Sequence, residues 1–349
     1  MPYKIAGIDV HKRMLHVVVS DVEVDGEYEF TRQVFGSYPE ALRSLATWLV
    51  QHQVEEVVME STAQYWKPVW GALERYWKPI CGKRESARRR PGTLHLAQAL
   101  SNRGRRGRKK DFRDAERLVK RLVANELTLS FVPDVQQRLW RTVMRTKYQL
   151  TCNRVQLQNR LEALLEEAHS KLSSLVSDLL GVSARRMLKA IAEGETDPMA
   201  LAALADERLR TTPERLRDAL GVCQELNSVY RRLIEMALEE LASIDKRIDE
   251  LKQAMADLLR PHEDQVKRLA EVPGLSVDSV QQIIAEVGAS ASTFPSERHL
   301  SSWVGACPGE EESAEVSSKV QYFPDQATKS VGNYPNGLIV PHPRHIAAI

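Results

Sequence analysis

Short apolar runs alternate with amphipathic stretches over the first third of the chain. Four apolar runs predict β-strands, at residues 5–9, 15–20, 28–34 and 54–60. Two stretches with a helical period predict helices, at residues 39–51 and about 65–76. A short apolar run at 93–100 then precedes a helical pattern that begins at Asp111. This order predicts an α/β domain, in which active-site residues gather at strand ends.

Two long helices dominate the pattern beyond residue 135. The first begins near Gln136 and is expected to bury one face, formed by Leu139, Val143, Leu150, Leu157, Leu161 and Leu164. The second carries a heptad seam from Tyr230 to Leu258, which predicts a coiled coil. This seam can pair with the first long helix of the same chain or with another chain, and the pattern favours neither. We expect a homo-oligomer, a dimer or tetramer, held by this coiled coil.

A third region begins near Pro261. A helix, a turn at Pro273-Gly274 and a second helix over 277–287 predict a helix-hairpin-helix arrangement. Such a turn exposes backbone N–H groups at a helix N-terminus, which makes Gly274 a candidate phosphate-binding position.

The chain is therefore expected to combine an α/β domain with all-α regions. The expected divisions are an α/β catalytic domain at 1–134, a coiled-coil region at 135–260 and a small helical domain at 261–319. Residues 320–349 lack a helical period and contain four prolines, so we predict a disordered tail.

Charge is distributed unevenly along the chain. The formal net charge is only +2, but residues 83–121 contain fifteen Lys or Arg against four acidic residues, a local net charge of +11. Such a strip favours a polyanion, DNA or RNA, with an affinity that falls as salt rises. The candidate contacts belong to a Gly/Arg-rich loop and are Arg103, Arg105, Arg106, Arg108, Lys109 and Lys110. A solvated loop is the alternative interpretation.

Cysteine usage and hydropathy exclude other classes of protein. The four cysteines are scattered, without a Cys-x-x-Cys pair or clustered histidines, which argues against a zinc site and a disulfide framework. No apolar run approaches the roughly 20 residues of a membrane-spanning helix, and the N-terminus lacks the apolar region of a signal peptide. We expect a cytoplasmic protein that binds no membrane.

Four acidic residues stand where metal chemistry would need them. Asp9 and Glu60 close two predicted strands, and Asp111 and Asp114 share one face of a predicted helix. Adjacent carboxylates repel unless a cation joins them, and hard cations such as Mg²⁺ prefer oxygen ligands. Two such ions can serve both the attacking and the leaving oxygen of a phosphoryl transfer. The alternative interpretation is that each acid only caps or complements a helix N-terminus.

A set of short motifs occurs along the chain in a particular order. They are Gly7-Ile8-Asp9-Val10-His11-Lys12, Met59-Glu60-Ser61-Thr62, Arg108-Lys109-Lys110-Asp111-Phe112-Arg113-Asp114-Ala115, Val272-Pro273-Gly274-Leu275, Ala285-Glu286-Val287-Gly288 and Trp303-Val304-Gly305-Ala306-Cys307-Pro308-Gly309. In this order they resemble the DEDD transposases of insertion sequences, the family called one-ten, and in particular its eleven-eleven subgroup. The resemblance spans about residues 4–314.

The resemblance implies a fold, a chemistry and partners. The first domain would be RuvC-like, that is ribonuclease H-like, with Asp9, Glu60, Asp111 and Asp114 binding Mg²⁺, two ions in all. The C-terminal domain would supply the nucleophile Ser313, which attacks a DNA phosphate to give a covalent intermediate before strand exchange. Members of the family also bind a structured guide RNA encoded by the element. The implied location is the bacterial cytoplasm, at the nucleoid.

The chain departs from the family after Ser313-Ala314. The family continues with Gly-Lys and a basic helix, whereas this chain continues with Glu315-Val316-Ser317 and a tail rich in Pro, Gly and Asn. We therefore expect a copy of the enzyme that binds metal and nucleic acid but is impaired in strand transfer. Two other interpretations stay open: a RuvC-like nuclease or junction resolvase that uses water, and a nucleic-acid-binding scaffold without catalysis.

Overall fold

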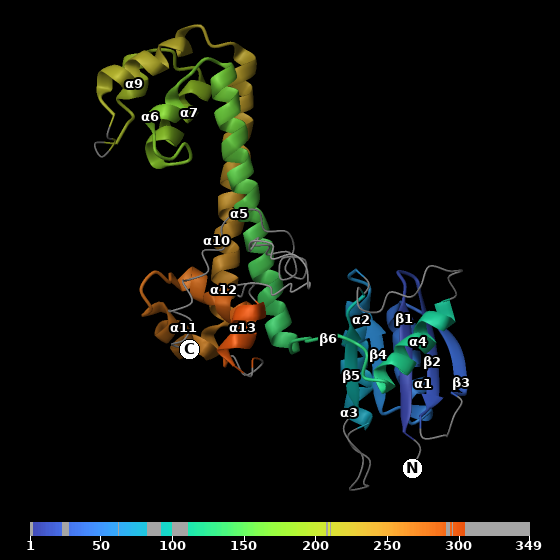
Figure 1. Ribbon diagram of the computed structural model, residues 1–349. Helices are drawn as coiled ribbons and strands as arrows, with labels where there is room; N and C mark the ends of the chain where they lie inside the picture. Colours follow the sequence, from blue (N-terminus) through green and yellow to red (C-terminus); the bar gives the residue numbers. More distant parts are fainter. Residues whose placement is uncertain are drawn as a thin grey trace, which may run out of the picture. The chain divides into compact units, whose positions relative to one another are not determined.

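A computed structural model shows the chain as two compact units, divided between Val132 and Pro133 (Figure 1). The structure describes residues 3–22, 28–61, 63–81, 92–99, 111–206, 209, 211–290, 294 and 296–303. The first unit is mixed α/β and the second is helical. Each has hydrophobic core clusters of its own.

The first unit is built on a six-stranded sheet with the order β3-β2-β1-β4-β5-β6. Its strands are β1 (Lys4–Val10), β2 (Met14–Asp21), β3 (Phe30–Gly36), β4 (Glu56–Glu60), β5 (Thr93–Ala97) and β6 (Leu129–Ser130). The first three form an antiparallel meander, and β4 and β5 run parallel to β1. This is the strand order of a ribonuclease H-like core, so the predicted RuvC-like α/β fold is confirmed for this unit.

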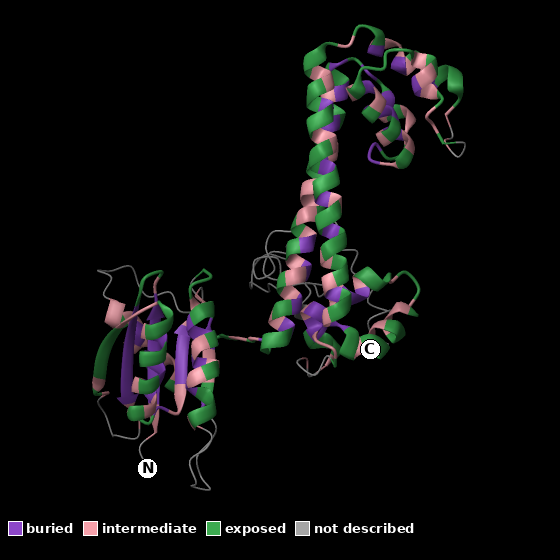
Figure 2. Ribbon diagram, turned by 180° about the vertical axis from the view of Figure 1, so that it is seen from behind, coloured by how far each residue is buried: buried purple, intermediate pink, exposed green. Residues whose placement is uncertain are grey.

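Helices cover both faces of the sheet. They are α1 (Pro39–Gln51), α2 (Trp66–Tyr76), α3 (Lys78–Cys81) and α4 (Asp111–Val123). Successive side chains of a strand point to opposite faces, so alternate residues of β1 pack against the helices on the two faces of the sheet. Ala6 and Ile8 join the core with α1 and α2, whereas Ile5 packs with α4. Figure 2 shows the buried strands between the more exposed helices.

Strand bounds differ most from the prediction in β3 and β4. β3 begins at Phe30 rather than Tyr28, and as a largely exposed edge strand it has little hydrophobic alternation to mark its ends. Val54 precedes β4, although it is buried. Its N–H donates to the carbonyl of Leu49 at the end of α1, and its side chain fills the core beneath that helix. The predicted strand therefore begins two residues before β4, because Val54 is apolar and buried but lies outside the strand.

The second unit is organised on two long antiparallel helices, α5 (Val135–Glu167) and α10 (Ser228–Leu258) (Figure 1). The predicted heptad seam of α10 is confirmed, since Ile234, Leu241 and Ile248 are buried along it. Its partner is α5 of the same chain, and residues of both helices form one core cluster. The seam is therefore covered within one chain. Oligomerisation stays a prediction and needs another surface.

The buried face of α5 differs from the prediction near the start of the helix. Leu139 is 49% exposed, whereas its neighbour Trp140 is buried. The first turns of α5 pack against α12 (Val277–Val287) as well as α10, and this additional contact shifts the buried face by one residue. Farther along α5, the predicted Leu157 and Leu161 are buried.

Smaller helices pack at the two ends of this hairpin (Figure 1). One end carries α6 (Leu172–Leu175), α7 (Val182–Glu193), α8 (Pro198–Ala202), α9 (Pro213–Leu220) and the 3-10 helix η1 (Gly221–Gln224). The other end carries η2 (Arg260–His262), α11 (Glu263–Ala270), α12 and α13 (Glu297–Trp303). Helices α11 and α12 share one core with the hairpin, in which Trp140, Met255 and Ile284 are buried. The predicted order of helix, Pro-Gly turn and helix is present, but its core includes the two long helices.

Several predictions concern residues without a described structure. The Gly/Arg-rich loop, Ser313 and the tail at 320–349 lie outside the described residues. Within the described ranges, no helix is long and apolar enough to cross a membrane. No disulfide joins the cysteines that lie in these ranges, Cys81, Cys152 and Cys223.

Candidate active site

Asp9 and Glu60 leave neighbouring strands of the sheet on the same face. β1 and β4 are parallel, and their last paired residues directly precede these two acids. Gly7 of β1 and Val58 of β4 both face α4, so alternation places the two carboxylates, two residues later, on the α4 side as well. Asp9 is buried there, with 7% of its surface exposed.

Gly7 allows α4 to approach the sheet closely. A Cβ atom at this position would lie 2.3 Å from the carbonyl oxygen of Ala115 and 2.8 Å from Cγ2 of Val119. No side chain fits there, so α4 lies directly on β1. Its first residue, Asp111, is thereby brought to the ends of β1 and β2. The glycine of the Gly7-Ile8-Asp9 motif thus positions the site through packing.

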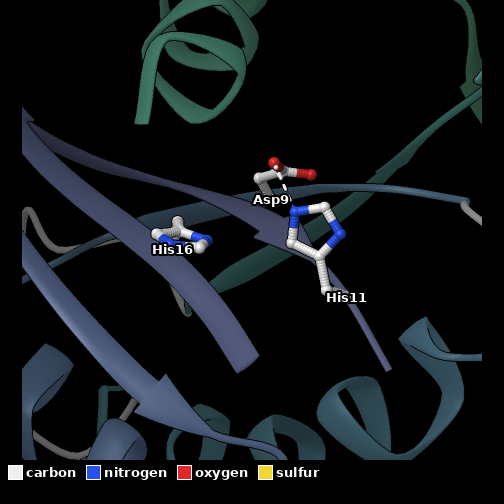
Figure 3. Close-up of side chains that lie close together, drawn as sticks. All are labelled: Asp9, His11 and His16. Carbon is white, nitrogen blue, oxygen red and sulfur yellow. Dashed lines mark ion pairs between the residues drawn. The ribbon is translucent and has the colours of Figure 1, made fainter. Parts of the chain in front are cut away.

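Two histidines join Asp9 and Asp111 in one cluster. The Nε2 atom of His11 lies 3.2 Å from Oδ2 of Asp9 and 3.6 Å from Oδ1 of Asp111. The Nε2 atom of His16 lies 3.7 Å from Oδ2 of Asp111, and His16 is the strand partner of Asp9. Figure 3 shows Asp9 with the rings of His11 and His16 and marks the ion pair between Asp9 and His11. Titratable groups from β1, the following turn, β2 and α4 therefore meet at one point.

His16 is largely enclosed by other rings. It is 9% exposed and packs edge-on against His11 and Phe112. Its Nδ1 atom is buried and has no hydrogen-bond partner among the described residues. A buried polar atom without a partner costs free energy, so this nitrogen is available to bind a cation.

The sequence motifs do not identify His11 or His16 as residues of the site. His11 stands in a motif only as a neighbour of Asp9, and His16 stands in none. The available signal is strand alternation, because β2 folds back on β1 and sets His16 opposite Asp9. That pairing depends on the length of the turn between the strands, which the apolar pattern does not define.

Asp114 has a different partner. Its Oδ1 atom accepts a hydrogen bond of 2.7 Å from Nη1 of Arg117. Asp114 precedes Leu118 by one helical turn, and Leu118 packs against β4, so Asp114 lies toward the strand that ends in Glu60. The structure thus brings Asp9 and Asp111 together through His11, and it pairs Asp114 with an arginine.

The cluster fits a divalent cation. One ligand atom from each of Asp9, His11 and His16 lies within 4.8 Å of the others, and this is the one such group of three among the described residues. Ligands about 2.1 Å from an ion are at most about 4.2 Å apart, so small side-chain rotations close the set. Asp111 stands beside them as a further oxygen donor.

Two family models match the chain. Residues 6–170 match the family model of the IS110 DEDD domain, whose description is "Transposase". Residues 266–324 match a second family model, whose description is "Transposase IS116/IS110/IS902 family". Together they cover more than half of the chain. The chain belongs to the IS110 family of transposases. It is therefore an enzyme that acts on DNA, and its DEDD character implies the use of a divalent metal.

Two solved structures are similar to part of the transposase. Thermus thermophilus RuvC is 12% identical with a TM-score of 0.27, over 36% of this chain and 99% of that chain. T. thermophilus RuvC in complex with a Holliday junction substrate is 10% identical with a TM-score of 0.25, over 37% and 99%. No curated protein matches the transposase.

The predicted phosphate-binding turn of the transposase lies between α11 and α12. Gly274 has a φ of +89°, a left-handed conformation that favours glycine, and no described atom lies within 4 Å of a Cβ placed there. Ser276 caps α12 by accepting a 3.2 Å hydrogen bond from the N–H of Ser279. The turn is therefore an open hairpin, and phosphate binding by it stays a prediction.

The C-terminal end of α12 is held by α5. Nε and Nη2 of Arg145 donate to the two carboxylate oxygens of Glu286, both at 2.9 Å. Arg141 donates to the carbonyl of Glu286 at 2.6 Å, and Gln137 donates to the same oxygen at 3.2 Å. Burial lowers the pKa of Arg141, an effect that Glu286 opposes. These bonds satisfy a helix-terminal carbonyl and lock α12 to α5.

The predicted nucleic-acid contacts of the transposase lie mostly outside the described residues. This holds for Arg103, Arg105, Arg106, Arg108, Lys109 and Lys110. On α4 the basic strip continues, but Arg117 and Arg121 pair with Asp114 and Glu126. The loop before α4 therefore remains the predicted DNA or RNA surface.

Proposed function

We propose that this transposase cuts and rejoins DNA at its insertion sequence, with a metal-binding acidic site in the first unit and Ser313 as the nucleophile. The observation that carries the proposal is the cluster of Asp9 and Asp111 with two histidines beneath α4. Glu60 supports it, because it ends the adjacent strand on the same face. Ser313 lies within the segment 266–324 that matches the family.

Asp9, Glu60, Asp111 and Asp114 are the residues proposed to hold Mg²⁺, as two ions. When bound, such ions supply positive charge that activates a nucleophile and stabilises a leaving oxygen. Asp9 is well placed for this because a buried carboxylate needs a positive partner to stay ionised. The close packing of α4 on Gly7 supports this assignment, because it holds the start of α4, and with it Asp111, near the end of β1.

The proposed reaction conserves the number of phosphate ester bonds. The hydroxyl of Ser313 loses its proton, and its oxygen forms a bond to a DNA phosphorus atom. The bond from this phosphorus to one deoxyribose oxygen breaks, and that oxygen takes up a proton. The hydroxyl of another DNA end then attacks the phosphoserine, which releases Ser313 and joins the two strands. No external energy source is needed.

The proposed partners are DNA, a structured RNA encoded by the element, and further copies of the chain. The local charge of +11 over residues 83–121 supports binding of a polyanion, with an affinity that depends on salt. An oligomer would use a surface other than the heptad seam of α10, because α5 covers that seam.

Trapping the phosphoserine tests this function. The purified transposase is incubated with the element RNA, labelled DNA carrying the element ends, and Mg²⁺ or Mn²⁺, then denatured and resolved on a gel. We expect labelled DNA attached to the protein, and its loss in Ser313→Ala. Ser317→Ala is the matched control and should keep the adduct.

The tail of this chain sets the expected yield. Because Gly-Lys is absent after Ala314, we expect little completed strand transfer by the parent protein. The double variant Glu315→Gly, Val316→Lys restores these two residues and should give a larger amount of the protein–DNA adduct. Cleavage without any adduct in both proteins would support a water nucleophile. DNA binding without cleavage in both proteins would support a scaffold.

A further inference from the structure

We propose that Asp9, His11 and His16 form a mixed oxygen and nitrogen site that binds a first-row transition ion, Mn²⁺, Co²⁺ or Zn²⁺, more tightly than Mg²⁺. The inference deepens the proposed function, on which it rests for the role of Asp9. It concerns the choice of ion and not the DNA chemistry.

All three ligands come from one β-hairpin. The pairing of β1 with β2 sets Asp9 directly opposite His16. The N–H of His11 donates to the carbonyl of Met14 at 3.0 Å, which closes the turn and fixes the backbone of His11. The ligand atoms then lie within 4.8 Å of one another, with Asp9 and His11 at 3.2 Å. The site is therefore largely preformed by local structure.

Nitrogen donors change which ion such a site prefers. Mg²⁺ favours oxygen ligands and gives up its waters reluctantly. Imidazole suits transition ions, and the affinity of a mixed nitrogen and oxygen site rises from Mn²⁺ through Co²⁺ to Cu²⁺, with Zn²⁺ also strong. The four acids alone offer no nitrogen. The two histidines add two nitrogen donors beside one of those acids.

Hydrogen bonds among the described residues leave nitrogen atoms of both histidines unsatisfied. Nε2 of His11 lies 3.2 Å from Asp9 and 3.6 Å from Asp111, but it is buried and has no hydrogen-bond partner among the described residues. Nδ1 of His16 is likewise buried without such a partner, and its Nε2 lies 3.7 Å from Asp111, beyond a hydrogen bond. Buried polar atoms without partners cost free energy, and a bound cation beside these imidazoles and carboxylates would offset that cost.

Direct metal binding tests the inference on the full chain without a histidine tag. Calorimetric titrations with Co²⁺, Mn²⁺ and Mg²⁺ are compared between the parent protein, His11→Ala and His16→Gln, with the Co²⁺ absorption spectrum recorded in parallel. We expect Co²⁺ to bind more tightly than Mg²⁺. Each histidine variant should weaken Co²⁺ binding by about 10–100-fold and alter its spectrum, while Mg²⁺ binding stays nearly unchanged.

His95→Gln is the matched control. His95 also pairs with a carboxylate on a neighbouring strand, that of Glu56 at 2.9 Å, but the described residues place no third ligand there. We expect this variant to bind Co²⁺ as the parent does.

Equal Co²⁺ affinity in the parent and both site variants would overturn the inference, as would an equal fall in Mg²⁺ affinity. Circular dichroism checks folding, and His11→Ala, at a partly exposed position, gives the answer if His16→Gln unfolds. The adduct assay separates the two proposals. Histidine-dependent Co²⁺ binding without a Ser313 adduct would refute only the proposed chemistry, and an adduct without such binding would refute only the ion preference.

Discussion

Two clusters of charged groups in this molecule differ in how closely their members fit. Where α5 meets α12, Arg145 makes two parallel bonds of 2.9 Å to Glu286, and Arg141 donates at 2.6 Å to the carbonyl of the same residue. At the strand ends of the first unit, the contacts that join Asp9 and Asp111 to the histidines span 3.2–3.7 Å. One cluster consists of short, charge-assisted hydrogen bonds, and the other is more widely spaced.

Clustered charge therefore does not by itself mark a functional site. A fork of arginine on carboxylate satisfies both partners and leaves nothing for a ligand to add. Carboxylates beside imidazoles at more than 3 Å have room for a cation that binds them all. We therefore interpret the α5–α12 cluster as structural and the strand-end cluster as functional, and the two should respond oppositely to substitution.

The largest expected effect is that of Asp9→Asn on DNA cleavage. Removing this carboxylate should lower the cleavage rate by about 10³-fold or more, because bound metal contributes several kcal/mol to the transition state. The free energy of unfolding should stay the same or rise, since a buried charge is removed. Cleavage assays and urea unfolding measure the two effects. Asp21→Asn, at the other end of β2, is the control, and a cleaving Asp9→Asn enzyme would contradict the assignment.

The next effect is that of Gly7→Ala, which alters the site without touching a ligand. The new methyl group would lie 2.3 Å from the carbonyl of Ala115, so α4 must move away and take Asp111 with it. We expect a loss of about 1–3 kcal/mol in unfolding free energy together with weaker metal binding. Gly71→Ala in α2 is the control, since apart from its own helix backbone no described atom lies within 4 Å of its Cβ position. A Gly7→Ala protein with parental stability and metal affinity would show that close packing is not needed.

Glu286→Gln should have the opposite pattern. It leaves Arg141 and Arg145 without their carboxylate, so the unfolding free energy of the second unit should fall by about 2 kcal/mol, less than for a fully buried pair. Metal binding should be unchanged. Glu240→Gln, which breaks an exposed pair with Arg160 on the same long helices, should cost less than about 0.5 kcal/mol. A change in metal affinity in Glu286→Gln would contradict the interpretation of the α5–α12 cluster as purely structural.

The smallest effect concerns Lys147, which lies under α12. Burial, with a further contribution from the charge of Lys252, lowers the pKa of Lys147 to about 8, although Asp278 accepts a hydrogen bond from it. Above pH 8 the unfolded chain then holds this proton more firmly than the folded chain, so unfolding free energy should rise by about 1 kcal/mol from pH 8 to 9. Urea unfolding of the parent and Lys147→Met measures it. Identical pH dependence in the two proteins would contradict the shifted pKa.

Much of the fold could be predicted because it follows from local periodicity. The strand that ends in Asp9, the helix that begins at Asp111 and the heptad seam of α10 each depend on a pattern a few residues long. Glu60 could be placed beside Asp9 because parallel strands bring their carboxyl ends to one edge.

Other features depend on contacts that no short pattern contains. His16 becomes a site residue only when β2 pairs with β1 in the observed register. The buried face of α5 is set by α12, and the partners Arg145 and Glu286 are 141 residues apart in the chain. The helical period of its neighbours predicts that Leu139 lies in the core, but the additional contact with α12 buries Trp140 instead.

Calorimetric titration of Mn²⁺ into three proteins, each with the whole chain of 349 residues, separates the two interpretations of these clusters. The proteins are the parent, Asp9→Asn and Glu286→Gln. We expect the parent and Glu286→Gln to bind Mn²⁺ with the same affinity, and Asp9→Asn to bind it at least about tenfold more weakly. Equal affinity in the parent and Asp9→Asn would contradict the assignment of the strand-end cluster as the metal site.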